Sequence, residues 1–278
     1  MFNETVSNAA INGMAISLAI AVLFPIFLLL FWKLSQRPKL VSFFIGAATF
    51  IVFALIVEQA FHTIVMMAAG GGDALAGMDK MQANIWIYGL YGGICAAVFE
   101  EVGRFIAMKF CMKNFLDKKN AIMYGIGHGG IEAIIIVGIS EISNIATAVA
   151  INSGSLESVL SAVPQDQREV LYEQVSALWT TPAADFYMAG LERVIAILLH
   201  IGLSYLVYRF VKYKEKNCFF MALAIHFLVD FGTVVMSQAL PMMAIEAILA
   251  VVVIVLIVFV VNKYKNENET ATIVANEE

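Results

Sequence analysis

The sequence predicts an all-α, multi-pass membrane protein. Three observations carry this prediction: 61% of the 278 residues are hydrophobic and only 14% are charged, the mean hydropathy is +0.83, and the apolar residues gather in long segments. A soluble domain is typically about 45–50% apolar and about 25% charged. One water-soluble core could not bury this much apolar surface, whereas roughly seven spans of about 20–25 residues would accommodate it in a bilayer.

Seven apolar segments are long enough to cross a membrane, and we predict each of them as a helix. They cover residues 11–32, 41–67, 84–112, 121–150, 186–211, 217–238 and 241–262. The third and fourth exceed the usual span, so we expect them to tilt, kink or extend beyond the bilayer. We therefore predict a single transmembrane domain at 1–265, followed by a short disordered acidic tail at 266–278.

The longest loop, at about 152–185, is polar but contains apolar residues at helical spacing. These residues are Val170, Leu171, Val175 and Leu178. The spacing predicts a short amphipathic helix at the membrane surface.

Basic residues divide sharply between the two sets of loops. Lys80 and Arg168 are on the side of the N-terminus. On the opposite side are Lys33, Arg37, Lys39, Lys109, Lys113, Lys118, Lys119, Arg209, Lys212, Lys214, Lys216, Lys263 and Lys265. By the positive-inside rule the N-terminus is outside and the C-terminus cytoplasmic, and we expect an integral protein of a bacterial plasma membrane. No basic stripe suited to phosphates appears, so nucleic acid is not an expected partner.

Two adjacent glutamates and an arginine lie within the third predicted span. Arg104 follows Glu100 by four residues and Glu101 by three, so either carboxylate can pair with it on one helix face. Two carboxylates at this depth do not both ionise cheaply. One would stay charged against Arg104, while the other would be available to exchange a proton with water. Such residues commonly mark a functional interior, the alternative being a structural ion pair.

The fourth and sixth predicted spans each carry a histidine followed four positions later by an acidic residue. In the fourth span His128 stands among four glycines and shares a helix face with Glu132. The glycines would let a neighbouring helix or a substrate backbone approach closely. In the sixth span His226 and Asp230 form the same pair, which alone could equally be a self-satisfied polar contact.

Other ionisable residues of the spans are interpreted differently. His200 is central in the fifth span and could support the site. Glu192 and Arg193 lie near the outer end of that span, and we predict them to be a structural pair. Glu58 and His62, one turn apart in the second span, are predicted to be another.

Glu100, His128 and His226 are expected to lie at one depth. The two histidines are roughly seven to ten residues from the predicted cytoplasmic ends of their spans, or ~10–15 Å at about 1.5 Å per residue. Glu100, about two-thirds of the way along a span that runs inward, reaches a similar level. A common depth on three helices is what a shared site requires, and these residues could line a water-filled cavity open to the cytoplasm.

At these positions the sequence resembles the superfamily of CAAX proteases and bacteriocin-processing enzymes, which are intramembrane glutamic proteases. It most resembles the branch of YhfC-type membrane peptidases, with the PrsW-type proteases as a further relative. The superfamily pattern is a Glu-Glu pair followed by Arg, then an aromatic residue with His four positions later, then His with Asn or Asp four positions later. The matching residues are Glu100, Glu101 and Arg104, then Tyr124 and His128, then His226 and Asp230.

Two features differ from the prenyl-protein proteases of this superfamily. Two residues separate Arg104 from the glutamate pair instead of three, and Asp230 stands where the eukaryotic enzymes have Asn. The resemblance therefore implies the catalytic groups rather than a specificity for prenylated peptides.

The resemblance implies a hydrolytic role for each group. Glu100 would take a proton from a water molecule that His128 holds. His226 and Asp230 would orient and stabilise the oxyanion of the tetrahedral intermediate, which for Asp230 requires either protonation or a role in orienting His226. Four residues would position these groups: Glu101, Arg104, Glu132 and His200. Glu132 would orient His128 from one turn away.

The predicted function is an intramembrane endopeptidase whose partners are the lipid bilayer and a membrane-associated peptide or protein substrate. The resemblance favours metal-independent chemistry without a cofactor, although Glu100, His128 and His226 could supply three ligands of a catalytic zinc. The sequence contains no His-Glu-x-x-His motif. Two alternatives stay open: a proton-coupled transporter that uses the buried Glu, His and Arg residues as a relay, and a non-catalytic membrane scaffold.

Overall fold

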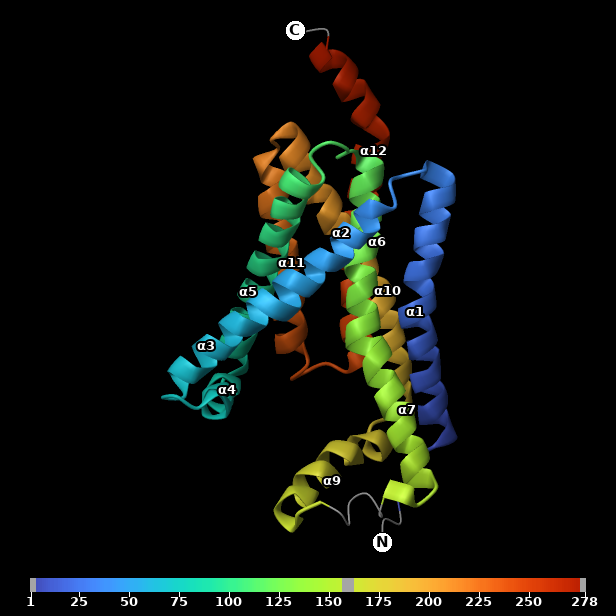
Figure 1. Cartoon of the computed structure of the whole chain (residues 1–278), viewed down its shortest axis with the longest axis vertical. Helices are drawn as coiled ribbons and strands as arrows, with labels where there is room; N and C mark the ends of the chain where they lie inside the picture. The colour runs from blue at the N-terminus through green and yellow to red at the C-terminus, as the bar shows by residue number, and fades with distance from the viewer. Residues whose placement is uncertain (1–3, 157–162, 276–278) are drawn as a thin grey trace.

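The computed structural model describes residues 4–156 and 163–275, and it contains no strand in either range (Figure 1). Within these ranges seven helical segments are long and apolar enough to cross a membrane. They are Asn8–Gln36, Val41–Ala69, Ile85–Cys111, Lys118–Asn152, Ala183–Tyr213, Lys216–Met236 and Met242–Glu267. The predicted all-α, multi-pass fold is confirmed, and each span begins and ends within several residues of its predicted bounds.

Several spans are composed of more than one helical element. The first half of the chain forms α1 (Asn8–Gln36), α2 (Val41–Phe50), η1 (Ile51–Glu58), α3 (Gln59–Ala69), α4 (Ala74–Gln82), α5 (Ile85–Ile106) and η2 (Ala107–Cys111). The second half forms α6 (Lys118–Ala133), η3 (Ile134–Gly138), α7 (Ile139–Asn152), α9 (Gln165–Thr180), α10 (Ala183–Tyr213), α11 (Lys216–Met236) and α12 (Met242–Ala275). The elements labelled η are π-helical.

Helix ends coincide with residues that satisfy free backbone groups. The Ser7 hydroxyl accepts a hydrogen bond from the Ala10 N–H at the start of α1 (3.1 Å), and the Asp117 carboxylate accepts one from the Asn120 N–H at the start of α6 (2.8 Å). Such caps supply acceptors for N–H groups that have no partner within the helix. At the other end of α1, Arg37 adopts a left-handed conformation with φ 53°, which ends the helix.

Each π-helical turn lies close to a buried ionisable residue. η1 ends at Glu58, η2 begins three residues after Arg104, and η3 begins two residues after Glu132. A π-helical turn contains an extra residue, widens the helix and occurs frequently at functional sites. These turns allow long spans to change the direction in which their side chains point beside the polar interior.

α6 and α10 occupy the centre of the bundle. α10 packs against α1, α6, α11 and α12, while α5 packs mainly against α11. In Figure 1 the segment from α2 to α3 crosses obliquely in front of the other helices. Glycines permit the closest crossings: a Cβ atom on Gly127 of α6 would lie 2.0 Å from the backbone oxygen of Phe43 in α2, and one on Gly46 would lie 2.1 Å from that of Tyr124.

The two ends of the bundle differ in charge. The loops after α1, η2 and α10 and the last turns of α12, which carry most of the basic residues, lie at the upper end in Figure 1, and α1 begins at the lower end. We refer to the upper end as the basic end. This segregation is what the positive-inside rule uses, and the side of the membrane that each end faces stays a prediction.

The predicted surface helix is present as α9, at the end opposite the basic end. Leu178 is buried in a small apolar cluster with Phe186 and Ala148, and Val175 packs against this cluster. Val170, by contrast, is exposed. The amphipathic interpretation therefore holds for the second half of α9, and residues 157–162 of the same loop lie outside the described residues.

The predicted tail differs from the structure. α12 continues to Ala275, so the segment that we predicted to be disordered from residue 266 is helical up to that point, and residues 276–278 lie outside the described part. Neither glycine nor proline interrupts residues 263–275. In addition, Glu267 is buried, and its carboxylate accepts hydrogen bonds from the hydroxyls of Tyr205 (2.9 Å), Tyr208 (2.5 Å) and Tyr213 (2.8 Å). Tertiary contacts thus extend the helix past the apolar segment.

Candidate active site

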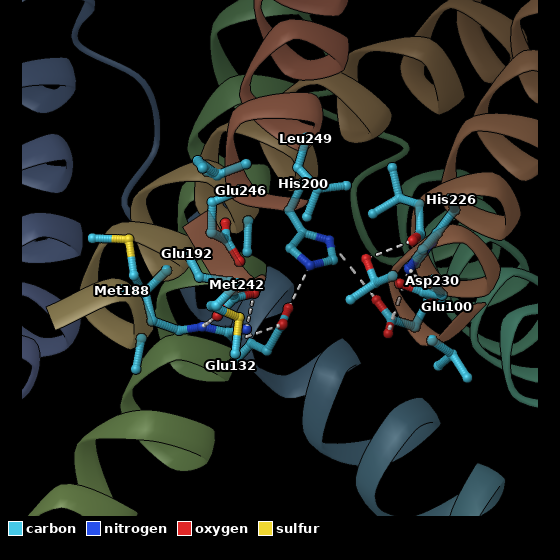
Figure 2. Close-up of a pocket in the computed structure, with 17 residues that line it drawn as sticks. Glu100, Glu132, Met188, Glu192, His200, His226, Asp230, Met242, Glu246 and Leu249 are labelled. Atoms are coloured by element: carbon cyan, nitrogen blue, oxygen red, sulfur yellow. Dashed lines mark hydrogen bonds and ion pairs between the residues drawn. The ribbon is translucent and has the colours of Figure 1, made fainter. Parts of the chain in front are cut away.

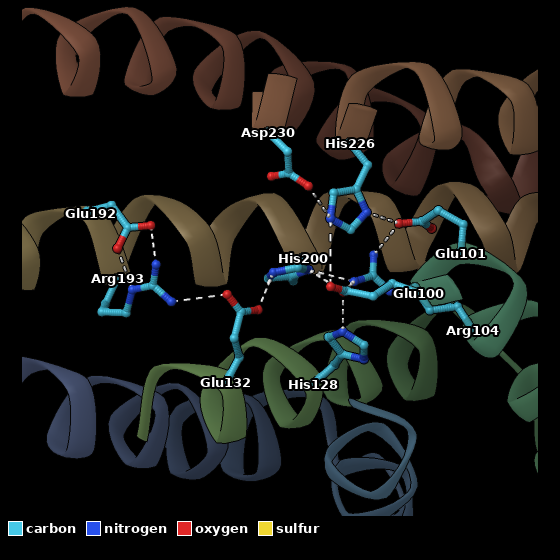
Figure 3. Close-up of polar contacts among 10 residues, drawn as sticks. All are labelled: Glu100, Glu101, Arg104, His128, Glu132, Glu192, Arg193, His200, His226 and Asp230. Carbon is cyan, nitrogen blue, oxygen red and sulfur yellow. Dashed lines mark hydrogen bonds and ion pairs between the residues drawn. The ribbon is translucent and has the colours of Figure 1, made fainter. Parts of the chain in front are cut away.

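Glu100 of α5 lies at the centre of a buried polar network (Figure 3). Its Oε2 atom is 2.8 Å from His128 Nε2 on α6 and 3.1 Å from Arg104 Nη2 one turn along α5. An ionised carboxylate only accepts hydrogen bonds, so both nitrogens donate to it. His128 and Arg104 are fully enclosed, whereas Glu100 is 7% exposed.

Glu101 connects the arginine to the sixth span. Its Oε1 atom accepts hydrogen bonds from Arg104 Nη1 (2.9 Å) and His226 Nδ1 (2.8 Å). On the other edge of the same imidazole, His226 Nε2 is 3.5 Å from Asp230 Oδ2 and 3.9 Å from Glu100 Oε1. The predicted grouping of α5, α6 and α11 residues is therefore realised in the structure.

His200 of α10 joins this centre to a second set of charges. Its Nδ1 atom is 2.5 Å from Arg104 Nη2, and its Nε2 atom forms a close contact with Glu132. Arg193 Nη1 donates to Glu132 (3.0 Å), and the remaining guanidinium nitrogens of Arg193 contact Glu192. Because a guanidinium cannot accept, His200 Nδ1 must be the acceptor, so the ring proton is on Nε2, which lies close to Glu132.

The predicted Glu192–Arg193 pair is present but has a further partner, and the structure gives Glu132 other partners than His128. Glu132 is bonded to His200 and Arg193 rather than orienting His128. Glu192 and Arg193 are not an isolated structural pair, because Arg193 also pairs with Glu132 and both residues line the cavity described below. Arg193 and His200 are seven positions apart, which places them on nearly one helix face. This spacing was the sequence signal that both residues could contact the same partner, Glu132.

The remaining predicted pair has a third member. His62 Nε2 is 3.2 Å from Glu58 Oε1, as the spacing indicates, and His62 Nδ1 is 2.6 Å from the hydroxyl of Tyr91 on α5.

Aromatic rings surround His128. The rings of Tyr124 and Phe50 pack against its imidazole at centroid distances of 6.1 and 5.4 Å. These contacts fix the position of the imidazole.

A cavity of about 480 Å³ adjoins the network (Figure 2). Glu100, His200, His226 and Asp230 line it, whereas His128 does not. From Glu100 the cavity runs away from the basic end, and Met188 and Met242 line it near the first turns of α10 and α12. The cavity expected to open at the predicted cytoplasmic end therefore extends the opposite way. The spacing of residues along single helices does not predict this direction, because the cavity lies between the first turns of two different helices, α10 and α12.

Glu246 of α12 is a cavity residue that the sequence interpretation missed. It is 3% exposed and lines the cavity together with Glu192. The signal was present, since Glu246 is the single ionisable residue in the apolar segment 241–262. A charged residue in such a segment is costly unless it faces a protein interior or a polar cavity.

Four residues of the network could hold a metal ion. Glu100, His128, Glu132 and His200 are buried, and one ligand atom from each lies within 4.8 Å of the others. Two imidazoles and two carboxylates fit zinc in number and kind. This set differs from the predicted one, because Glu132 and His200 take the place of His226. In the present arrangement, however, His200 cannot donate a lone pair to a metal, because Nδ1 faces Arg104 and Nε2 carries a proton.

The sequence matches the family described as "YhfC intramembrane metalloprotease" over residues 20–258. The chain belongs to this family. It is also 37% identical over 249 residues, covering 89% of this chain and 93% of the relative, to the "Uncharacterized membrane protein YhfC" of Bacillus subtilis (strain 168). No solved structure matches the chain. The matched region includes every residue of the network and the whole cavity.

Proposed function

We propose that this chain is an intramembrane endopeptidase that hydrolyses a peptide bond of a membrane-associated peptide or protein with a water molecule activated by Glu100. The supporting observation is that the two oxygens of Glu100 have different surroundings. Oε2 is held by Arg104 and His128, whereas Oε1 is 3.9 Å from Nε2 of His226, which lines the same cavity. A water molecule between these two atoms would be within hydrogen-bond reach of both.

In this reaction Glu100 takes a proton from the water as the water oxygen bonds to the carbonyl carbon of the substrate. His226 donates its Nδ1–H to Glu101, so it carries a second proton on Nε2 to stabilise the oxyanion of the tetrahedral intermediate, and Asp230, 3.5 Å from Nε2, orients this imidazolium and offsets its charge. When the carbon–nitrogen bond breaks, Glu100 returns its proton to the leaving amine. His128 and Arg104 hold the Glu100 carboxylate in place, so His128 acts through Glu100 and not by binding the water directly.

We further propose that the chemistry is independent of metal. Arg104 Nη2 lies 3.1 Å from Glu100 and 2.5 Å from His200, so a guanidinium already faces the atoms that would serve as ligands. Zinc bound by Glu100, His128, Glu132 and His200 would supply a Lewis acid and a more acidic water. Binding it would require Arg104 to withdraw from His200.

The function is tested by comparing the membrane peptides of cells that contain the unaltered chain or Glu100→Gln. The best candidate substrate is then cleaved by the purified protein in proteoliposomes. We expect Glu100→Gln to lower the cleavage rate by about 10²–10⁴-fold, the contribution typical of a general base, and His128→Ala to lower it strongly because Glu100 loses a donor.

Glu141→Gln is the matched control, since Glu141 is a buried glutamate of α7 whose carboxylate accepts a hydrogen bond from Asn144 outside the cavity. It should retain the cleavage rate. Full turnover in both Glu100→Gln and His128→Ala would contradict the proposal. Elemental analysis of the same preparations addresses the metal. Zinc at one equivalent, lost in His128→Ala together with activity, would overturn the metal-independent mechanism.

One observation favours a second function. A series of buried Glu and His side chains runs from Glu101 through His226 and Glu100 to His128, at 2.8, 3.9 and 2.8 Å, and such a series can relay protons. The same proteoliposomes distinguish this transporter from a protease. Proton flux that depends on Glu100 in the absence of peptide cleavage would favour transport.

A further inference from the structure

Glu246 has a buried carboxylate that lines the cavity. It lies in the second turn of α12 and is 3% exposed. In Figure 2 Glu246 lies beyond His200 on the same side as Glu192, away from Asp230 and His226. Within the described part of the chain its Oε2 atom has no hydrogen-bond partner. A buried carboxylate in this condition costs free energy unless a donor or a cation reaches it.

The nearest cation of the cavity is already engaged. The guanidinium of Arg193 contacts Glu192 through Nε and Nη2 and donates to Glu132 through Nη1. This end of the cavity thus holds three carboxylates, from Glu132, Glu192 and Glu246, against one guanidinium. The local excess of negative charge favours a positively charged occupant.

The other walls of this end are apolar. Met188, Met242 and Leu249 line it beside Glu246. A space with apolar walls and an acidic end suits a group with a long aliphatic stem and a cationic head. Lysine and arginine side chains have this form.

We propose that Glu192 and Glu246 form a subsite that binds a lysine or arginine side chain of the substrate. The proposal deepens the endopeptidase function and rests on it, because it assigns a sequence preference to the same cavity. Glu246 would contact the cationic head, and the methionines would cover its stem. The subsite lies past His200 from Glu100, so the basic residue would be displaced along the substrate from the bond that is cut.

The test measures peptide binding to the full-length chain carrying Glu100→Gln, so that no turnover occurs. The protein is held in nanodiscs of phosphatidylcholine and phosphatidylglycerol, which contain no primary amine. The probes are fluorescent apolar peptides, identical except that one position carries lysine, norleucine or glutamate, and this position is moved stepwise along the peptide. Fluorescence anisotropy gives the Kd of each.

At one or two positions we expect lysine to bind at least about tenfold more tightly than norleucine, the range of a well-placed charge pair. Glu246→Gln should abolish this preference, and Glu246→Lys should reverse it in favour of glutamate. Glu141→Gln should leave it unchanged, because Glu141 is buried outside the cavity.

Equal binding of lysine and norleucine peptides at every position would overturn the subsite, as would a preference that persists in Glu246→Gln. If Glu246→Gln does not fold, the comparison of lysine and norleucine peptides binding to the protein that retains Glu246 still tests the subsite. With Glu100 restored, a lysine preference without cleavage of any peptide would contradict the protease and leave the subsite standing. Cleavage without a preference would contradict the subsite alone.

Discussion

Arg104 is the residue on which the charges of the centre depend. It is fully enclosed, and its terminal nitrogens serve Glu101, Glu100 and His200 at 2.9, 3.1 and 2.5 Å. Breaking a buried ion pair by removing one partner typically costs about 3–5 kcal/mol, because the other charge is left uncompensated. Arg104 therefore stabilises the fold as well as positioning Glu100.

Arg104→Met should lower the thermal midpoint strongly and abolish cleavage, since two carboxylates lose their shared partner. Adding Glu101→Gln to Arg104→Met should recover part of the stability but none of the activity, because Glu100 still lacks its donor. The change in thermal midpoint is measured by heating the purified protein and recording the fraction that remains folded at each temperature. Lys113→Met, at an exposed basic position, serves as the control. A thermal midpoint of Arg104→Met equal to that of Lys113→Met would show that the contacts of Arg104 do not stabilise the fold.

At the residue scale, local spacing identified only part of the network. The pairs of Arg104 with Glu100 and Glu101 lie within one helix, so i, i+3 and i, i+4 geometry sufficed to predict them. Arg193 and Glu132 are 61 positions apart and meet because α6 and α10 pack together. No local pattern contains that information.

Among the elements, the crossing of α2 and α6 sets the position of His128. The backbone of α2 lies against Gly127, the residue immediately before His128. A methyl group there would lie 2.0 Å from the Phe43 carbonyl oxygen, which belongs to backbone and cannot rotate away. The two helices would have to separate.

Gly127→Ala should therefore destabilise the protein by about 1–3 kcal/mol or more, the range for overpacked interiors, and reduce cleavage by displacing His128. Gly92→Ala in α5 is the matched control, because a Cβ atom at Gly92 meets nothing within 4 Å. It should be neutral or slightly stabilising, since alanine is the better helix former. Thermal unfolding and cleavage by both variants check this. Equal effects of the two substitutions would contradict the steric explanation.

Element boundaries were predictable wherever apolar length decided them. The seven spans follow from hydropathy alone, because each must cover the hydrocarbon thickness. The π-helical turns and α4 were not predicted. A π-helical turn depends on one extra residue accommodated by tertiary packing, and α4 is a nine-residue helix capped by Asp73 within a polar loop.

For the whole molecule, the distribution of basic residues predicts a cytoplasmic basic end. The native cysteines test it, since Cys111 at this end is exposed whereas Cys95 and Cys218 are buried. A membrane-impermeant maleimide should label Cys111 only after the cells are permeabilised. Asp79→Cys, at an exposed position of α4 at the opposite end, should be labelled in intact cells. The reverse pattern would contradict the predicted orientation.

The seven spans of the molecule were accessible from the sequence, but the direction of its cavity was not. Depth along individual helices placed Glu100, His128 and His226 at one level, and they do meet. The cavity extends toward Met188 and Met242 because α10 and α12 leave space between their first turns. That space depends on how the two helices pack, which hydropathy does not encode.

The contact of Glu267 with three tyrosines has a practical consequence for anyone who expresses this protein. The acidic tail resembles a dispensable appendage, and a cloning strategy would readily end the chain at Lys265. Such a cut would leave the hydroxyls of Tyr205, Tyr208 and Tyr213 without their shared acceptor. A purification tag attached after residue 278 preserves these hydrogen bonds, whereas one that replaces residues 267–278 would remove them.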